Sequence, residues 1–407
     1  DILDAHGYKL ATSKFVKTIS VNPTRIGKHY SEVAHVLAPL LKIDQAKLEK
    51  RLKPTFRTNK NGDILKDKNG DPVYDTHVRL KRKVLPEIWE EIKKAMNQIE
   101  LKGKPAKLTQ KQRLFYYVLR SKAVYAEATE EQVRVYPAGQ LAAHVLGYVN
   151  AEHVGKEGIE RILNTHLTGA LGWRTIEHDR GGTEHVERRV QNVPPRNGLN
   201  AVLTIDSGIQ SIVEEELVKS MREMKPKAIT AIVIDPRTGD VLAMANLPTY
   251  DPNIPGKDAN VRRNRAVTDL AEPGSTFKAI TVAAALNENE VKLHHKFHCS
   301  NGIFRYGGHI LHDHHSYGTL TVEEIITKSS NIGAAKIALK LGSEKLHKYI
   351  TDFGFGKRTG ILLLGERNGL VYPVNRWGKL AITRIPMGYG VMVTPLQTVM
   401  MMSAIAN

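Results

Sequence analysis

The sequence has 407 residues, 41% hydrophobic and 25% charged, which is typical of a globular protein of two or three domains. Its formal net charge of +17 favours anionic surroundings such as an acidic polymer or membrane surface, although solubility alone also accounts for such an excess. A single cysteine, Cys299, excludes an internal disulfide framework. No RNP, zinc-finger or Walker pattern supports nucleic acid as a partner, so none is expected.

Residues 1–195 are predicted to form a mixed, basic N-terminal region. Apolar residues recur at helical spacing in 31–52 and in 85–99, which predicts helices there. Two Asn-Gly-Asp turns in 59–75 predict an exposed hairpin or flap between them. The segment 192–200, "NVPPRNGLN", has two prolines and a glycine without periodicity and is the best linker candidate.

Residues 196–407 are predicted to form an α+β catalytic domain. The segment 201–221 changes from a short strand to a helix, and the turn residues 235–240 join two apolar runs into an antiparallel hairpin over 228–246. Helical patterns then follow around this hairpin, which favours the α+β class.

The segment 270–286, "LAEPGSTFKAITVAAAL", carries the first candidate for chemistry. Pro273 and Gly274 interrupt regular structure just before an apolar helix, and Ser275 lies at the start of that helix. Lys278 follows three residues later on the same face, where burial would lower its proton affinity and let it act as a base. The arrangement predicts a serine nucleophile for a carbonyl. The alternative is a serine N-cap followed by a solvated lysine.

A second candidate lies in the helical pattern over 321–342. Thr321 and Glu324 have the spacing of a capping box, which predicts the start of this helix. Ser329-Ser330-Asn331 then place polar groups inside an otherwise apolar helix, where they are unfavourable without a reason. A hydroxyl and an amide two residues apart can hold a lysine amine and a substrate amide. The alternative is a polar junction in the helix.

Together these motifs resemble the class B penicillin-binding proteins. The resemblance is carried by "RNRAVTDLAEPGSTFKAIT", "GTLTVEEIITKSSNIGAAKIAL" and "GYGVMVTPLQ", and upstream by "AIVIDPRTGDVLAMANLPTYDPN", "NGLNAVLTIDSGIQ", "YPAGQLAAHVLGYVN" and "GKEGIERILNTHLTG". It implies a penicillin-binding/β-lactamase-like transpeptidase domain over 196–407, with an antiparallel sheet flanked by helices, after an elongated α+β pedestal (dimerisation-type) module over 1–195. The wording "TDLAEPGSTFK" is closer to the division-type and sporulation-type enzymes than to the elongation type.

The resemblance also implies an activity and its residues. Ser275 would attack the penultimate D-alanine of a peptidoglycan stem peptide and form an acyl-enzyme, and β-lactams would trap the same serine. Lys278 would be the base, Ser329 would relay protons, Asn331 would bond the substrate's amide, and the Ser275 N–H would join the oxyanion hole. No cofactor or metal is implied. A glycosyltransferase and other division proteins would be partners, and a membrane anchor would precede Asp1 with the catalytic domain outside the bacterial cytoplasmic membrane.

The sequence departs from the family in one respect. No Lys-Thr-Gly or Lys-Ser-Gly string is present, and the nearest strings, 237–239 and 358–360, are predicted in turns. We interpret this as a chain that stops before the third motif, and the alternative is a natural pseudoenzyme that serves as a scaffold or β-lactam sensor. A D,D-carboxypeptidase or serine β-lactamase shares the chemistry, but neither needs a large non-catalytic region.

Two other patterns are weaker. His295, His298 and Cys299 invite a zinc site, but their spacing matches no standard structural zinc pattern and we expect no metal. Glu157 and Glu160 could be mistaken for paired glycosidase acids, but they are predicted to lie on the solvated face of a helix.

Overall fold

The computed structural model describes residues 1–59, 61–100, 108–127, 131–170, 172–175 and 191–407. The chain divides into two compact units, and each is described by itself: residues 12–135 form one, and residues 1–11 together with 136–407 form the other. Both units combine helices with largely antiparallel strand pairs, so the predicted α+β class is confirmed. No helix within the described ranges has the length and apolar character needed to cross a membrane.

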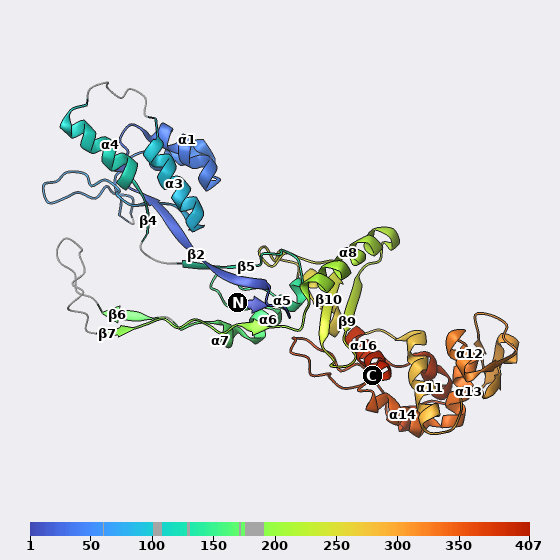
Figure 1. Cartoon of the computed structure of the whole chain (residues 1–407). Coiled ribbons are helices and arrows are strands. Elements are labelled where there is room, and N and C mark those ends of the chain that lie inside the picture. Colours follow the sequence, from blue (N-terminus) through green and yellow to red (C-terminus); the bar gives the residue numbers. More distant parts are fainter. Residues whose placement is uncertain (60, 101–107, 128–130, 171, 176–190) are drawn as a thin grey trace. The chain divides into compact units, whose positions relative to one another are not determined.

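The unit of residues 12–135 packs helices on a small sheet in which β2 pairs antiparallel with three strands (Figure 1). Its elements are β2 (Lys9–Val21), η1 (Pro23–Arg25), α1 (Tyr30–Leu41), α2 (Gln45–Leu52), β3 (Val78–Val84), α3 (Pro86–Gln98), α4 (Gln110–Lys122), β4 (Val124–Ala126) and β5 (Glu131–Val135). One apolar core joins sheet and helices through side chains that include Ile19, Leu37, Leu48, Ile92 and Leu119.

The helices of this unit follow the predicted periodicity. The pattern over 31–52 is confirmed but forms two helices, because Lys42 adopts a left-handed conformation and Asp44 caps α2 through Lys47 N at 3.0 Å. The pattern over 85–99 forms α3. In the predicted flap over 59–75, isolated antiparallel bridges surround the two Asn-Gly-Asp turns, as expected for exposed hairpins.

The other unit begins with short elements that hold its two chain segments together. They are β1 (Ile2–Leu3), α5 (Ala143–Leu146), α6 (Gly158–Ile162), α7 (Asn164–Leu167), β6 (Trp173–Thr175), β7 (Gln191–Val193) and β8 (Ala201–Val202). β1 pairs in parallel with β8, and β6 pairs antiparallel with β7. The segment 192–200, the linker candidate, is paired backbone here: Arg196 and Ala170 exchange two hydrogen bonds of 2.9 Å.

The predicted hairpin is confirmed as β9 (Ile229–Ile234) and β10 (Val241–Leu247), which pair antiparallel. α8 (Ser207–Met224) lies against β10, and α16 (Pro395–Ala406) lies against β9 (Figure 1). Met244 of β10 and Leu396 of α16 share a buried core. The predicted strand-to-helix change over 201–221 is also confirmed by β8 and α8.

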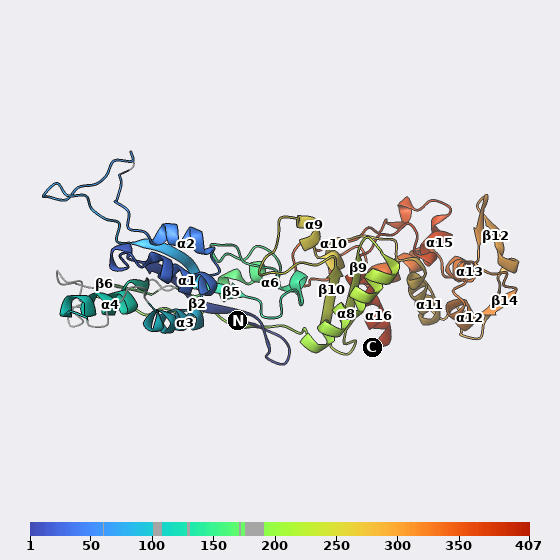
Figure 2. The same cartoon turned by 90° about the horizontal axis from the view of Figure 1, so that it is seen from above.

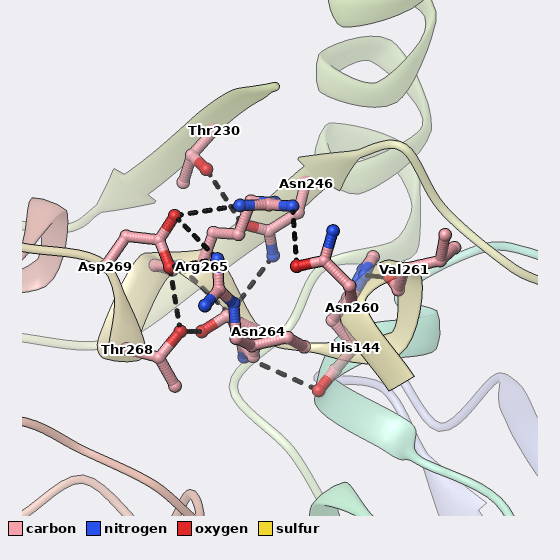
Figure 3. A network of polar contacts seen from close by, with 11 residues as sticks. His144, Thr230, Asn246, Asn260, Val261, Asn264, Arg265, Thr268 and Asp269 are labelled. Carbon is pink, nitrogen blue, oxygen red and sulfur yellow. Dashed lines mark hydrogen bonds and ion pairs between the residues drawn. The ribbon is translucent and has the colours of Figure 1, made fainter. Parts of the chain in front are cut away.

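A buried polar network ties this hairpin to the segment that leads to Ser275 (Figure 3). The hub is Asn264, the N-cap of α10 (Arg265–Thr268), whose side chain bonds Asn246 of β10 at 3.1 Å and the His144 carbonyl at 3.4 Å. Asn246 in turn accepts from Thr230 of β9 at 2.8 Å. Because buried polar groups are costly when unpaired, this network fixes how α10 sits on the hairpin.

The remainder of the unit is mainly helical, with small strand pairs beside α11, α12 and α13 (Figure 2). Its elements are α9 (Ala259–Arg262), η3 (Gly274–Phe277), α11 (Lys278–Asn287), β11 (Lys296–His298), η4 (Ser300–Gly302), β12 (Ile303–Tyr306), β13 (His309–His312), β14 (Thr319–Thr321), α12 (Val322–Thr327), α13 (Asn331–Leu341), α14 (Ser343–Asp352), η5 (Val374–Arg376), α15 (Ala381–Arg384) and η6 (Ile385–Met387). Apolar residues of α11 and α13 pack together and form the core beneath the candidate site.

Candidate active site

Ser275 lies on a tight turn that enters a buried helix. Pro273 precedes the turn η3, and Gly274 has φ +59°, a left-handed conformation that glycine adopts without cost. The chain then continues directly into α11, whose first residue is Lys278. The Ser275 side chain is exposed, and no described residue accepts or donates a hydrogen bond at its Oγ. Its hydroxyl is therefore open to a ligand.

A second glycine, Gly388, packs against the backbone of the turn that carries Ser275. A Cβ at Gly388 would lie 2.4 Å from the nitrogen and 2.3 Å from the oxygen of Gly274, so only glycine fits there. On the same side, Ala271 and Val393 exchange backbone hydrogen bonds of 3.0 and 2.9 Å. The "GYGVMVT" segment thus supports the turn.

Lys278 is the most informative residue of the site, because it is a charged side chain with only 2% of its surface exposed. Its Nζ donates to Ser329 O at 2.6 Å, to Ser329 Oγ at 3.0 Å and to Asn331 Oδ1 at 2.8 Å. A lysine ammonium has three protons, so these contacts use all of them. The alternative of a solvated lysine is excluded by this burial.

The prediction of a single helix over 321–342 is wrong, because the structure has two helices there. The predicted capping box at Thr321 and Glu324 is present, but α12 ends at Thr327 and α13 begins at Asn331. Ser329 has φ +54°, which breaks the helix, and Ser330 caps α13 by accepting from Gly333 N at 2.9 Å. The polar residues therefore form a junction, and this junction turns the Ser329 carbonyl and hydroxyl toward Lys278.

Asp313 is a residue of the site that the sequence did not reveal. Its carboxylate accepts from Ser330 Oγ at 2.8 Å, from Asn331 N, and from Ile332 N at 3.0 Å. Asn331 Nδ2 also donates to His312 O at 3.0 Å, which fixes the amide so that its oxygen faces Lys278. An acid at a helix N-terminus is stabilising. Because Asp313 lies in a histidine-rich loop well before α13 in the sequence, no local pattern indicated that it would contact this helix.

Burial governs the chemistry of Lys278. Desolvation lowers the pKa of its amine from 10.5 to about 8, and the nearby negative charge of Asp313 opposes part of that shift. At neutral pH about a tenth of the amine is then neutral, which suits a general base. The structure brings together Lys278, Ser329 and Asn331, and it places Ser275 one turn before Lys278 without a hydrogen bond between them.

The two remaining sequence patterns are the glutamate pair and the histidine-rich segment. Glu160 is buried and bonds the Tyr136 hydroxyl at 3.1 Å, and Glu157 pairs with Arg262 at 2.9 Å, so the predicted solvated face is wrong. Burial of Glu160 is tolerated because the Tyr136 hydroxyl donates to its carboxylate, whereas Glu157 stays partly exposed beside Arg262. In the described ranges no group of three or more His, Cys, Asp or Glu side chains is arranged to hold a metal ion.

Comparisons with known proteins identify the family of the chain. The family model for the penicillin binding protein transpeptidase domain matches residues 229–407, and the model for the penicillin-binding protein dimerisation domain matches residues 1–203. Stage V sporulation protein D of Bacillus subtilis is 33% identical over 414 residues, which cover all of this chain and 57% of that protein. Peptidoglycan D,D-transpeptidase FtsI of Escherichia coli is 37% identical over 69% of this chain and 47% of that protein. This chain therefore spans about half the length of these relatives.

Solved structures resemble the chain as well. Penicillin binding protein 2X of Streptococcus thermophilus matches all of this chain and 58% of its own, with a TM-score of 0.71 and 22% identity, which shows the shared fold. Penicillin binding protein 3 of Mycobacterium tuberculosis, solved with aztreonam, is 31% identical over 69% of this chain and 60% of its own, with a TM-score of 0.60. The two family models account for nearly the whole chain. It belongs to the class B penicillin-binding proteins.

Proposed function

We propose that the protein is a peptidoglycan D,D-transpeptidase that cross-links stem peptides through an acyl-serine at Ser275. The observation that carries the proposal is the buried Lys278 amine, one turn after an exposed serine and held by Ser329 and Asn331. In this proposal residues 196–407 carry the catalysis and residues 1–195 form the pedestal. The family matches and the printed name of the Escherichia coli relative support the reaction class.

The first step is acylation of the serine. Neutral Lys278 takes the Ser275 proton while Oγ attacks the carbonyl carbon of the penultimate D-alanine. In a 3₁₀ turn, residues three apart lie one above the other, so the lysine can reach the serine hydroxyl. The negative charge of the tetrahedral oxygen falls near the Ser275 N–H, at a helix start where such charge is favoured.

The second step removes the leaving amine. The bond from the carbonyl carbon to the terminal D-alanine nitrogen breaks, and that nitrogen takes the proton from Lys278 through the Ser329 hydroxyl. Ser329 suits this role because a hydroxyl both donates and accepts, and its Oγ lies 3.0 Å from Nζ. The amine of a neighbouring stem then attacks the ester carbonyl carbon and forms the new amide bond, while the bond from that carbon to Ser275 Oγ breaks. The proton of the amine passes through Ser329 to Lys278, and Lys278 returns a proton to Ser275 Oγ.

We also propose a place for this chemistry in wall synthesis at the septum. Similarity to FtsI supports a role in division, and similarity over the whole chain to a stage V sporulation protein supports a sporulation-type role as the alternative. The expected partners are stem peptides, β-lactams, a membrane glycosyltransferase and other division proteins. The proposed location of the catalytic domain is outside the bacterial cytoplasmic membrane.

Mass spectrometry of the full-length protein after incubation with a penicillin tests the proposal. We expect one penicillin adduct, on the peptide that holds Ser275. It should be lost in Ser275→Ala and retained in Ser316→Ala, which changes an exposed serine elsewhere in the unit. A folded protein without an adduct would overturn the proposed enzymatic function in favour of a scaffold. In a second incubation, with a stem pentapeptide, release of D-alanine without cross-linked product would identify a carboxypeptidase.

A further inference from the structure

A pocket of about 380 Å³ opens beside Asn331. Its walls come from three segments that are distant in sequence: β13, the first residue of α13, and the stretch from the end of α15 to Tyr389. The lining includes Ile310, His312, Asn331, Arg384, Met387 and Tyr389. The pocket thus shares Asn331 with the candidate active site, while most of its lining has no part in the proposed chemistry.

The pocket is also adjacent to the nucleophile. Met387 ends η6, and the next residue, Gly388, lies directly against the backbone of Gly274. Gly274 immediately precedes Ser275. One wall therefore continues into the support of the serine turn and another holds Asn331, so a group bound here would belong to a peptide that reacts at Ser275.

The charge of the pocket points to the kind of group it binds. Arg384 is its cationic residue, no acidic residue lines it, and no described carboxylate lies within ion-pair distance of Arg384. Arg384 Nη2 donates to Ile310 O at 3.3 Å across the pocket, which orients the guanidinium and leaves its other donors for a ligand. A guanidinium fork matches the geometry of a carboxylate, which it can bind with two parallel hydrogen bonds.

We propose that this pocket binds a carboxylate of the peptide substrate and that Arg384 determines the preference for it. The inference rests on the proposed transpeptidase function and adds a subsite to it. The carboxylate belongs either to the donor peptide that acylates Ser275 or to the acceptor peptide whose amine attacks the ester. Both sources present the same chemistry to Arg384, and the experiment below separates them.

The donor is tested on the full-length protein with two synthetic peptide thioesters. One carries a side-chain carboxylate, and the other carries the corresponding amide and is otherwise identical. We expect Arg384→Gln to lower kcat/KM of acylation about 10- to 100-fold for the carboxylate donor and to leave the amide donor nearly unchanged. Arg384→Lys should recover part of the preference, because it keeps the charge without the fork. Arg305→Gln, which changes an exposed arginine outside the pocket lining, should match the wild type.

The acceptor is tested on the preformed acyl-enzyme with an amine acceptor in its carboxylate and amide forms. If Arg384→Gln removes the preference for the carboxylate form at this step and not during acylation, the carboxylate belongs to the acceptor. The proposal is overturned if Arg384→Gln changes the rates with the carboxylate and the amide substrates by the same factor at both steps, or changes neither rate. Penicillin labelling separates the subsite proposal from the proposed transpeptidase function. If Ser275 is labelled but the protein shows no preference for the carboxylate, only the subsite proposal is overturned. If the wild type is not labelled, both proposals are overturned.

Discussion

Lys278 Nζ lies 2.8 Å from Asn331 Oδ1, across 53 positions of the sequence. Together with the two contacts to Ser329, this bond holds a buried amine at a fixed place one turn from Ser275, the proposed nucleophile. Since burial disfavours the charged form, the same packing that fixes the amine also prepares it to accept a proton.

The rate of acylation should depend on the protonation of Lys278. With a pKa of about 8, the neutral base increases as pH rises, so the rate of penicillin acylation should rise about tenfold per pH unit below that value and level off above it. Stopped-flow or quench measurements from pH 6 to 9 check this. Lys278→Arg should be inactive throughout, and a flat wild-type profile would contradict the role of the lysine as base.

Asp313 should tune this profile. Its negative charge raises the pKa of Lys278 against the effect of burial, so Asp313→Asn should move the midpoint of the rate profile to lower pH. Asp313→Ala should also lower the free energy of unfolding by roughly 2–4 kcal/mol, because the start of α13 loses its acceptor. Asp352→Asn, which changes an exposed acid on α14, is the control. A midpoint that stays in place would argue against an electrostatic role.

Gly388 should be needed for the serine turn. Gly388→Ala places a Cβ within 2.4 Å of Gly274 and also strains a residue at φ +78°, so we expect slow acylation and a loss of several kcal/mol of stability. Gly390→Ala is the matched control, because Gly390 has a similar φ of +77° but a Cβ there would lie 3.9 Å from Ile385 Cγ1, an ordinary contact. It should cost only about 1 kcal/mol. Equal effects in thermal unfolding would show that backbone strain, rather than the close approach, dominates.

The polar network in Figure 3 should stabilise the unit that carries the site. Asn264→Ala removes the cap of α10 and leaves Asn246 and the His144 carbonyl without that partner, so the free energy of unfolding should fall by about 2–3 kcal/mol. Asn260→Ala removes only a 3.4 Å contact from Arg265 at an exposed residue and should have little effect. Denaturant unfolding measures both, and similar midpoints for the two variants would refute the structural role.

Local patterns in the sequence were sufficient for much of the fold. The turn 235–240 predicts the hairpin because its residues favour tight turns between apolar runs, and the capping box predicts the start of α12. The same reasoning failed at Ser329 to Asn331, where an apolar helical period suggested one helix. Ser329, the left-handed residue in that stretch, accepts from Lys278, and its neighbour Ser330 donates to Asp313; no local pattern contains these contacts.

The sequence by itself determined the serine–lysine spacing, the glycine before it and the polar triplet, because these depend on neighbours along the chain. Only the tertiary structure decided that Lys278 meets Ser329 and Asn331, that Asp313 holds the start of α13, and that Glu160 is buried. It also decided that Arg384 and Asn331 line one pocket. Such contacts join residues that lie between 19 and 53 positions apart, and the packing of whole helices rather than local preference sets them.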